Sequence, residues 1–155
     1  MAEPTVPTIR NAAKAVVLHD GRILLQRAHW SGQDCYFLPG GGQNPGEAFD
    51  AAARREVLEE AGLDVTPERL LWLREYIGAN HDGDPGDHRV EAIFLCRLDS
   101  DPHQLGGHAQ DEAQTGLEWV ELEKVPSLNL LPHGLRDLIA NLTDDTPTRY
   151  LGDLA

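Results

Sequence analysis

Short apolar runs separated by turn residues predict a chain rich in β-strands. Residues 12–19 and 22–27 flank Asp20-Gly21, and an Asp-Gly pair between two apolar runs is a strong signal for a β-hairpin. Later runs end at a proline, at glycines or in polar stretches, and they predict four more strands: residues 35–38, 70–77, 89–98 and 117–122.

Two other segments have the composition and the end signals of helices. Residues 45–61 are rich in Ala, Glu, Arg and Leu, and Gly62 stands where a glycine commonly ends a helix. Residues 135–142 are a second helix candidate, with Pro132 near its start. Because strands precede, separate and follow the two helices, we expect an α/β domain with a mixed β-sheet and helices on its faces.

The ends of the chain and two polar stretches lie outside these elements. We expect residues 1–10 to form a flexible lead, residues 11–142 to form one domain, and residues 143–155 to form a frayed C-terminal tail. The stretches 78–88 and 99–116 are predicted to be long loops. Such loops are unusual in a compact domain unless they form a site.

Composition and charge narrow the partners of the chain. It has 155 residues, 41% hydrophobic and 25% charged, which is enough to bury a core. A formal net charge of −13 argues against extended nucleic acid as a partner, and the apolar runs are too short to cross a membrane. An excess of carboxylates instead suits divalent cations, which would also allow a small phosphorylated substrate to bind.

The cysteines and the first residues indicate an intracellular setting. Cys35 and Cys96 lie beside apolar residues without the spacing of a metal site, so two buried free thiols are expected. Residues 1–10 lack the apolar core of a secretory signal, and we therefore expect a cytoplasmic protein.

The chemistry of the chain concentrates on the helix predicted before Gly62. At about 100° per residue, Glu56, Glu59 and Glu60 share an arc of roughly 100° beside an apolar stripe. Like charges at these spacings cost roughly a few tenths of a kcal/mol per pair, and a bound cation would offset that cost. Carboxylate oxygens favour Mg²⁺ or Mn²⁺ over zinc, and such a metal suggests attack of water on phosphorus. A run of glutamates alone is more often a solvated helix face.

The surrounding spacing is more specific, and it resembles the Nudix box. In that motif a glycine is followed by five residues, Glu, seven residues, Arg-Glu, an aliphatic residue, one residue, Glu-Glu, one residue, Gly and an aliphatic residue. This chain matches each position with Gly41, Glu47, Arg55, Glu56, Val57, Glu59, Glu60, Gly62 and Leu63. The similarity extends more loosely to residues 38–40, 118–120 and 125–126. The chain is thereby identified as a member of the Nudix hydrolase family, similar to MutT.

The resemblance implies an α/β/α sandwich around a mixed sheet. It also implies Mg²⁺- or Mn²⁺-dependent hydrolysis of a nucleoside diphosphate linked to another moiety, as in a nucleoside triphosphate, a nucleotide sugar or a dinucleotide. Carried over by position, the metal ligands are the carboxylates of Glu56, Glu59 and Glu60 and the carbonyl of Gly40. Glu47 and Arg55 would pair to brace the loop against the helix.

The general base and the substrate stay open at this point. Many family members use an acidic residue from a later loop, for which Asp111 and Glu112 are the candidates here, and Glu56 is the alternative. The two loop carboxylates are equally well explained as solvent-exposed residues. His81 and His88 bracket an acidic loop without EF-hand spacing, so contact with substrate is favoured there over a metal site.

Three classes of function fit the family. The first is a pyrophosphohydrolase acting on a small nucleotide-type substrate. The second is a non-catalytic module that senses nucleotides, which would tend to lose ligand carboxylates, whereas this chain keeps all three. The third is an isomerase or an RNA-decapping relative, and the low basicity argues against long RNA. We expect the pyrophosphohydrolase and leave open whether it forms a homodimer.

Overall fold

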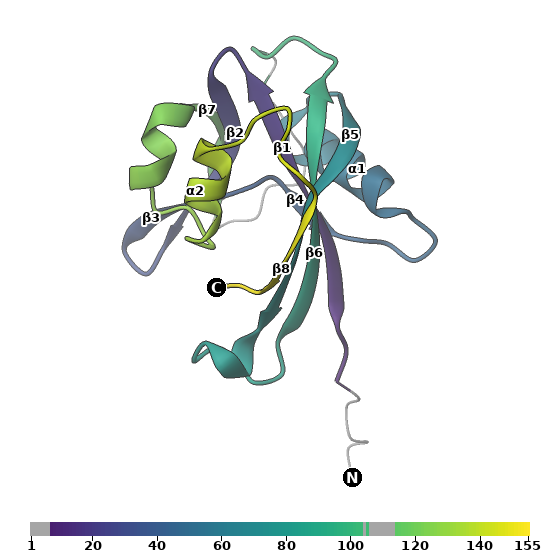
Figure 1. The fold of residues 1–155 in the computed structure, drawn as a ribbon, viewed down its shortest axis with the longest axis vertical. Coiled ribbons are helices and arrows are strands. Elements are labelled where there is room, and N and C mark those ends of the chain that lie inside the picture. Colours follow the sequence, from purple (N-terminus) through teal and green to yellow (C-terminus); the bar gives the residue numbers. More distant parts are fainter. Residues whose placement is uncertain (1–6, 104, 106–113) are drawn as a thin grey trace.

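A mixed β-sheet organises the part of the chain that the structure, a computed structural model, describes: residues 7–103, 105 and 114–155 (Figure 1). The elements follow one another as β1 (Arg10–His19), β2 (Arg22–Trp30), β3 (Gln33–Phe37), β4 (Gly40–Gly42), α1 (Phe49–Ala61), β5 (Val65–Ile77), η1 (Gly78–Asn80), β6 (His88–Leu98), β7 (Gln114–Glu121), η2 (Leu122–Ser127), α2 (Leu135–Ala140) and β8 (Arg149–Asp153).

The strand order explains where the glycine-rich segment lies. The sheet runs β3-β2-β1-β6-β5-β8, with β7 paired to β2 and β4 paired to β1. β1 pairs with β2 only near the turn that joins them, at Leu18 and His19. The earlier part of β1, from Ala12 to Lys14, pairs with β4 in antiparallel orientation. The glycines of β4 therefore lie against the middle of the sheet, directly before the loop that leads to α1.

The hairpin predicted at Asp20-Gly21 is confirmed. Both residues have positive φ, 50° for Asp20 and 71° for Gly21, and His19 pairs with Arg22 across the turn. Two consecutive residues with positive φ match the right-handed twist of the flanking strands. The short-range sequence pattern is sufficient to predict this hairpin.

The two helices cover opposite faces of the sheet. Val57 and Ala61 of α1 pack against Ala15 and Val17 of β1, whereas Ala13 packs against the first turn of the same helix. The other face of the sheet packs under α2, in a cluster that includes Val16, Trp72, Ile93, Leu135 and Ile139. The expected α/β/α arrangement around a mixed sheet is confirmed.

The expectation of a frayed C-terminal end is wrong. Residues 149–153 form β8, which pairs parallel to β5 from Trp72–Arg149 to Glu75–Asp153. The Asp153 carboxylate also accepts hydrogen bonds from the backbone of Ile77 at 2.9 Å and from the side chain of Asn80 at 2.9 Å. This strand has little hydrophobic pattern, and its partners lie more than seventy residues earlier in the chain.

The expectation for the cysteines is met. Cys35 and Cys96 are both buried free thiols, and burial raises the pKa of Cys96 to about 12. Within residues 7–103, 105 and 114–155, no helix has the length and apolar character needed to cross a membrane.

Candidate active site

The helix α1 carries the predicted carboxylates and ends as its sequence indicates. Gly62 adopts a left-handed conformation, φ 69°, and its N–H donates to the carbonyl of Leu58 at 3.0 Å. A residue with a β-carbon rarely adopts this conformation. The turn sends Leu63, which is fully buried, into the core, and this anchors the C-terminal end of the helix.

Arg55 joins the helix to the glycine-rich loop. Its Nε and Nη2 donate to the two carboxylate oxygens of Glu47 at 2.7 and 2.9 Å, a bidentate pair. The same Nη2 donates to the carbonyl of Gly42 at 2.9 Å, and Nη1 donates to Glu56 at 2.9 Å and to Glu59 at 3.2 Å. One guanidinium therefore holds the end of β4, the start of the helix and two of its glutamates in a fixed arrangement.

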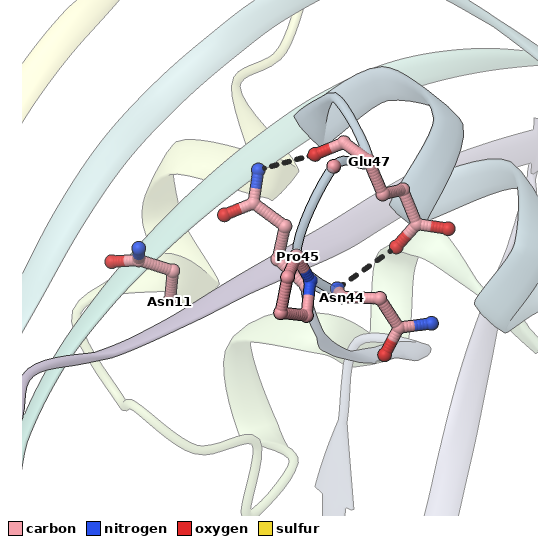
Figure 2. Close-up of a pocket in the computed structure, with 6 residues that line it drawn as sticks. Asn11, Asn44, Pro45 and Glu47 are labelled. Atoms are coloured by element: carbon pink, nitrogen blue, oxygen red, sulfur yellow. Dashed lines mark hydrogen bonds between the residues drawn. The ribbon is translucent and has the colours of Figure 1, made fainter.

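The loop between β4 and α1 is closed by Glu47 as well. Its carboxylate accepts the N–H of Asn44 at 3.1 Å, and its carbonyl accepts the side-chain amide of Gln43 at 2.8 Å (Figure 2). The hydrogen bonds from Arg55 and from the backbone of Asn44 lower the pKa of Glu47 to about 2. These side chains line a shallow polar pocket of about 230 Å³ together with Asn11, which comes from the start of β1.

Gly41 and Gly40 have no room for a side chain, because Glu56 lies against the first and β1 against the second. A β-carbon on Gly41 would lie 2.6 Å from the carboxyl carbon of Glu56, so this glycine lets the carboxylate pack directly against the backbone of β4. Gly40 has φ 148°, and a β-carbon there would lie 2.1 Å from the carbonyl oxygen of Ala13. Side chains at either position would displace the glutamate or separate β4 from β1.

Glu60 is the most buried of the three predicted metal ligands, with only 7% of its surface exposed. Its carboxylate accepts a long hydrogen bond of 3.4 Å from the N–H of Gly40. Burial, then the neighbouring charge of Glu56 and a hydrogen bond to that carboxyl group, raise the pKa of Glu60 to about 7, while the positive charge of Lys14 acts in the opposite direction. Burial beside a second carboxyl group thus favours the protonated form of Glu60.

The structure brings Glu56 and Glu60 together and turns Glu59 toward Arg55, with 43% of the Glu59 side chain exposed. In the described part of the chain, no three or more His, Cys, Asp or Glu side chains are arranged to hold a metal ion. The donor set still fits a hard cation, because the buried carboxylate of Glu60, the partly buried carboxylate of Glu56 and the carbonyl of Gly40 offer oxygen atoms only. A cation there would favour the ionised form of Glu60.

Other predicted residues lie elsewhere. Asp111 and Glu112 lie outside the described residues. His81 pairs with Asp153 at 2.8 Å and His88 pairs with Glu75 at 3.1 Å. Both histidines thus contact carboxylates of the β5–β8 edge.

Lys14 is an addition to the predicted set. It lies on β1 directly opposite Gly40, and its charge acts on Glu60. The sequence signal that could have identified it is a single lysine within the otherwise apolar run of residues 12–18.

A glycine strand, a loop braced by an arginine and a helix with clustered carboxylates thus lie together on a mixed sheet in an α/β/α sandwich. Residues 8–142 match the family model of the NUDIX domain. That match covers most of the chain, and the chain belongs to the Nudix family.

Curated relatives support this membership. The chain is 30% identical over 120 residues to the ADP-ribose pyrophosphatase of Methanocaldococcus jannaschii, covering 76% of this chain and 64% of that protein. It is 33% identical over 125 residues to the prenyl-diphosphate phosphatase of Methanosarcina mazei, covering 76% and 66%. It is 39% identical over 102 residues to the 8-oxo-dGDP phosphatase NUDT18 of Homo sapiens, covering 61% and 29%. The chain therefore spans less than two thirds of the length of each of these relatives.

Solved structures share the fold. A MutT Nudix hydrolase from Burkholderia pseudomallei is 28% identical with a TM-score of 0.64, covering 88% of this chain and 99% of that one. A Nudix hydrolase from Nitrosomonas europaea has a TM-score of 0.71 at 16% identity, covering 97% and 80%.

Proposed function

We propose that this chain is a divalent-metal-dependent pyrophosphohydrolase that cleaves a nucleoside diphosphate linked to another moiety. The observation that carries the proposal is the Arg55 network, which fixes the glycine strand against α1 so that Glu56 and Glu60 lie together beside Gly40 and Gly41. The three relatives support a reaction of this type, because each is named as a phosphatase or pyrophosphatase of a diphosphate compound.

The metal expected here is Mg²⁺ or Mn²⁺, which the carboxylates of Glu56, Glu59 and Glu60 and the carbonyl of Gly40 would hold. When bound, such an ion would neutralise phosphate charge and make a coordinated water acidic. Glu60 would have to be ionised to act as a ligand.

The residues of the chain then have separate tasks. Arg55 holds the Glu56 carboxylate through Nη1 and cannot take a proton itself, so it orients that carboxylate without competing for the proton of the attacking water. Asp111 and Glu112 of the later loop are candidates for the general base, and Glu56 is the alternative on the condition that it does not ligate the metal. Glu47 keeps Arg55 in place through the bidentate pair.

The relatives do not agree on a substrate. Their names include a damaged nucleoside diphosphate, ADP-ribose and a prenyl diphosphate. Only the diphosphate is common to all three, and this is the part of a substrate that the braced carboxylates would contact. We therefore propose a small nucleotide-type substrate without naming its second moiety.

A substrate panel tests the function. Purified protein is incubated with nucleoside triphosphates, nucleotide sugars, dinucleotides and ADP-ribose in Mg²⁺, and products are identified by mass spectrometry in ¹⁸O-labelled water. Release of a nucleoside monophosphate or of a phosphate product with one ¹⁸O supports the proposal and locates the phosphorus attacked. Tight nucleotide binding without turnover of any substrate would support the sensing module instead.

A further inference from the structure

A row of basic side chains lies on the sheet face opposite α1, next to the glycine strand. Along β1, Ala13 and Ala15 pack toward α1. Because side chains alternate along a strand, Arg10, Ala12 and Lys14 point to the other face. This row is unexpected in a chain with a net charge of −13, and it lies on the strand that pairs with the glycines at the start of the box.

Lys14 and Arg10 each lie beside a glycine of β4. A β-carbon on Gly40 would lie 2.7 Å from Cδ of Lys14, so the lysine stem runs along that glycine. The Arg10 guanidinium lies 3.7 Å from the corresponding position on Gly42. Ala12, between the two cations, is the only other side chain of this row and is small. Ala12 is itself buried, and the two basic side chains lie on either side of it, each beside a residue of the glycine strand that has no side chain of its own.

The neighbouring cations form close ion pairs, whereas the described part of the chain gives neither Arg10 nor Lys14 a carboxylate within ion-pair distance. Arg89 lies opposite Arg10 on β6 and binds both carboxylate oxygens of Asp87 at 3.0 and 2.8 Å. Arg74 of β5 forms a buried ion pair with Glu91 at 2.8 Å. Within the described residues, no ion pair or hydrogen bond joins the side chain of Arg10 or Lys14 to another group.

The position of Lys14 connects this row to the carboxylates. Lys14 lies directly opposite Gly40 in the β1–β4 pairing, and the N–H of Gly40 donates to the Glu60 carboxylate at 3.4 Å, so Gly40 lies between the two residues. A phosphate brought to Glu56 and Glu60 therefore arrives beside Lys14. From there, the chain of phosphates can continue along the glycine strand toward Arg10.

We propose that Lys14 and Arg10 form an anion rail that binds the diphosphate of the substrate along β4. This inference rests on the proposed function, because it assigns a contact for the substrate that the carboxylates would cleave. The rail acts as a binding element: a cation that contacts the phosphates equally in the ground state and in the transition state lowers KM and leaves kcat unchanged.

Equilibrium binding tests the rail independently of turnover. The probe is methylenediphosphonate, a diphosphate that cannot be hydrolysed, titrated by calorimetry at low ionic strength, once in EDTA and once in Mg²⁺. Lys14→Gln and Arg10→Gln are each expected to weaken binding by about tenfold in both buffers, and Lys14→Arg to retain it. Higher salt should reduce the difference between the wild type and these variants.

Two exposed basic residues elsewhere give matched controls. Lys124→Gln and Arg149→Gln remove the same charge and are expected to change binding by less than about twofold. Unchanged binding by Lys14→Gln and Arg10→Gln, or no binding by the wild type in either buffer, would overturn the rail. Wild-type binding of the probe without hydrolysis of any panel substrate would instead refute the proposed function and leave the rail standing. With an active substrate, Lys14→Gln should raise KM about tenfold with kcat nearly unchanged.

Discussion

Glu56 packs its carboxylate directly against the α-carbon of Gly41, fifteen residues earlier in the chain, at a distance that leaves no room for a methyl group. The contact places a charged group of α1 on the backbone of β4. It makes the position of Glu56 depend on the smallest side chain in the motif, and it connects the geometry of the strand to the chemistry of the helix.

Gly41→Ala should therefore be damaging. The new methyl group would lie 2.6 Å from the Glu56 carboxyl carbon, and a shift of about 1 Å in a reacting group can lower turnover about 100-fold. Gly86→Ala is the control, since its β-carbon would meet only a side-chain oxygen of Asp84 at 3.5 Å. Both variants are compared by kcat and thermal midpoint; similar kcat values for the two would contradict the close-approach argument.

Arg55→Ala should lower kcat while the fold is retained. The variant removes the bidentate pair with Glu47 and the bonds to Gly42 and Glu56, and losing such a positioning group typically costs about 10–100-fold in activity. Arg54→Ala on the same helix removes only an exposed pair with Asp64, and its kcat should stay close to that of the wild type. If the two arginine variants behave alike, Arg55 does not position the site.

Metal removal should abolish turnover. The carboxylates of Glu56 and Glu60 supply the oxygen ligands that Mg²⁺ prefers, and the reaction needs positive charge beside the phosphates. Activity is measured after dialysis against EDTA and again after Mg²⁺ or Mn²⁺ is restored. The thermal midpoint should rise with either ion in the wild type, and this rise should be smaller in Glu60→Gln. Full turnover in excess EDTA would refute a metal-dependent reaction.

Glu60 should make the metal-free protein less stable as the pH rises. Its pKa is raised to about 7 from 4.5, so the folded state binds more protons than the unfolded state between these values. The free energy of unfolding then falls as the pH increases through this window, and the loss persists above it. Glu60→Gln should remove this dependence while lowering kcat by several orders of magnitude. Thermal midpoints in EDTA at pH 5 and pH 8 measure the pH dependence of stability. An equal pH dependence in Glu60→Gln would contradict its assignment to Glu60.

Asp153→Ala should weaken the attachment of β8 without affecting turnover. Asp153 accepts hydrogen bonds from Ile77, Asn80 and His81, and these contacts lower its pKa to about 2 from 3.8. A lowered pKa stabilises the fold above pH 3.8, and that stabilisation is lost as the pH falls toward 2. At neutral pH the variant should have a lower thermal midpoint and faster amide exchange in β8.

Asp144→Ala provides the comparison for that experiment. Asp144 is an exposed carboxylate only nine residues earlier, and its removal should change the midpoint little. Equal midpoints for Asp153→Ala and Asp144→Ala would show that the bonds to the β5 edge do not hold the strand.

The sequence alone was sufficient for elements whose signals are local. The hairpin at Asp20-Gly21 needs only two residues that accept positive φ, and α1 ends at Gly62 because a glycine accepts the left-handed conformation there. The spacing of the motif likewise identified the family, and the resemblance implied the pairing of Glu47 with Arg55 that the structure contains.

The tertiary structure decided what depends on distant partners. Gly40–Gly42 and Arg149–Asp153 have no hydrophobic alternation, and they become strands only because β1 and β5 offer free edges to pair with. The helical arc of three glutamates could not reveal that Arg55 would draw Glu59 away while burial joined Glu60 to Glu56. Nor could local pattern place Lys14 beside Gly40, because that neighbour comes from strand pairing across twenty-six residues, and such pairing is fixed only when the whole sheet forms.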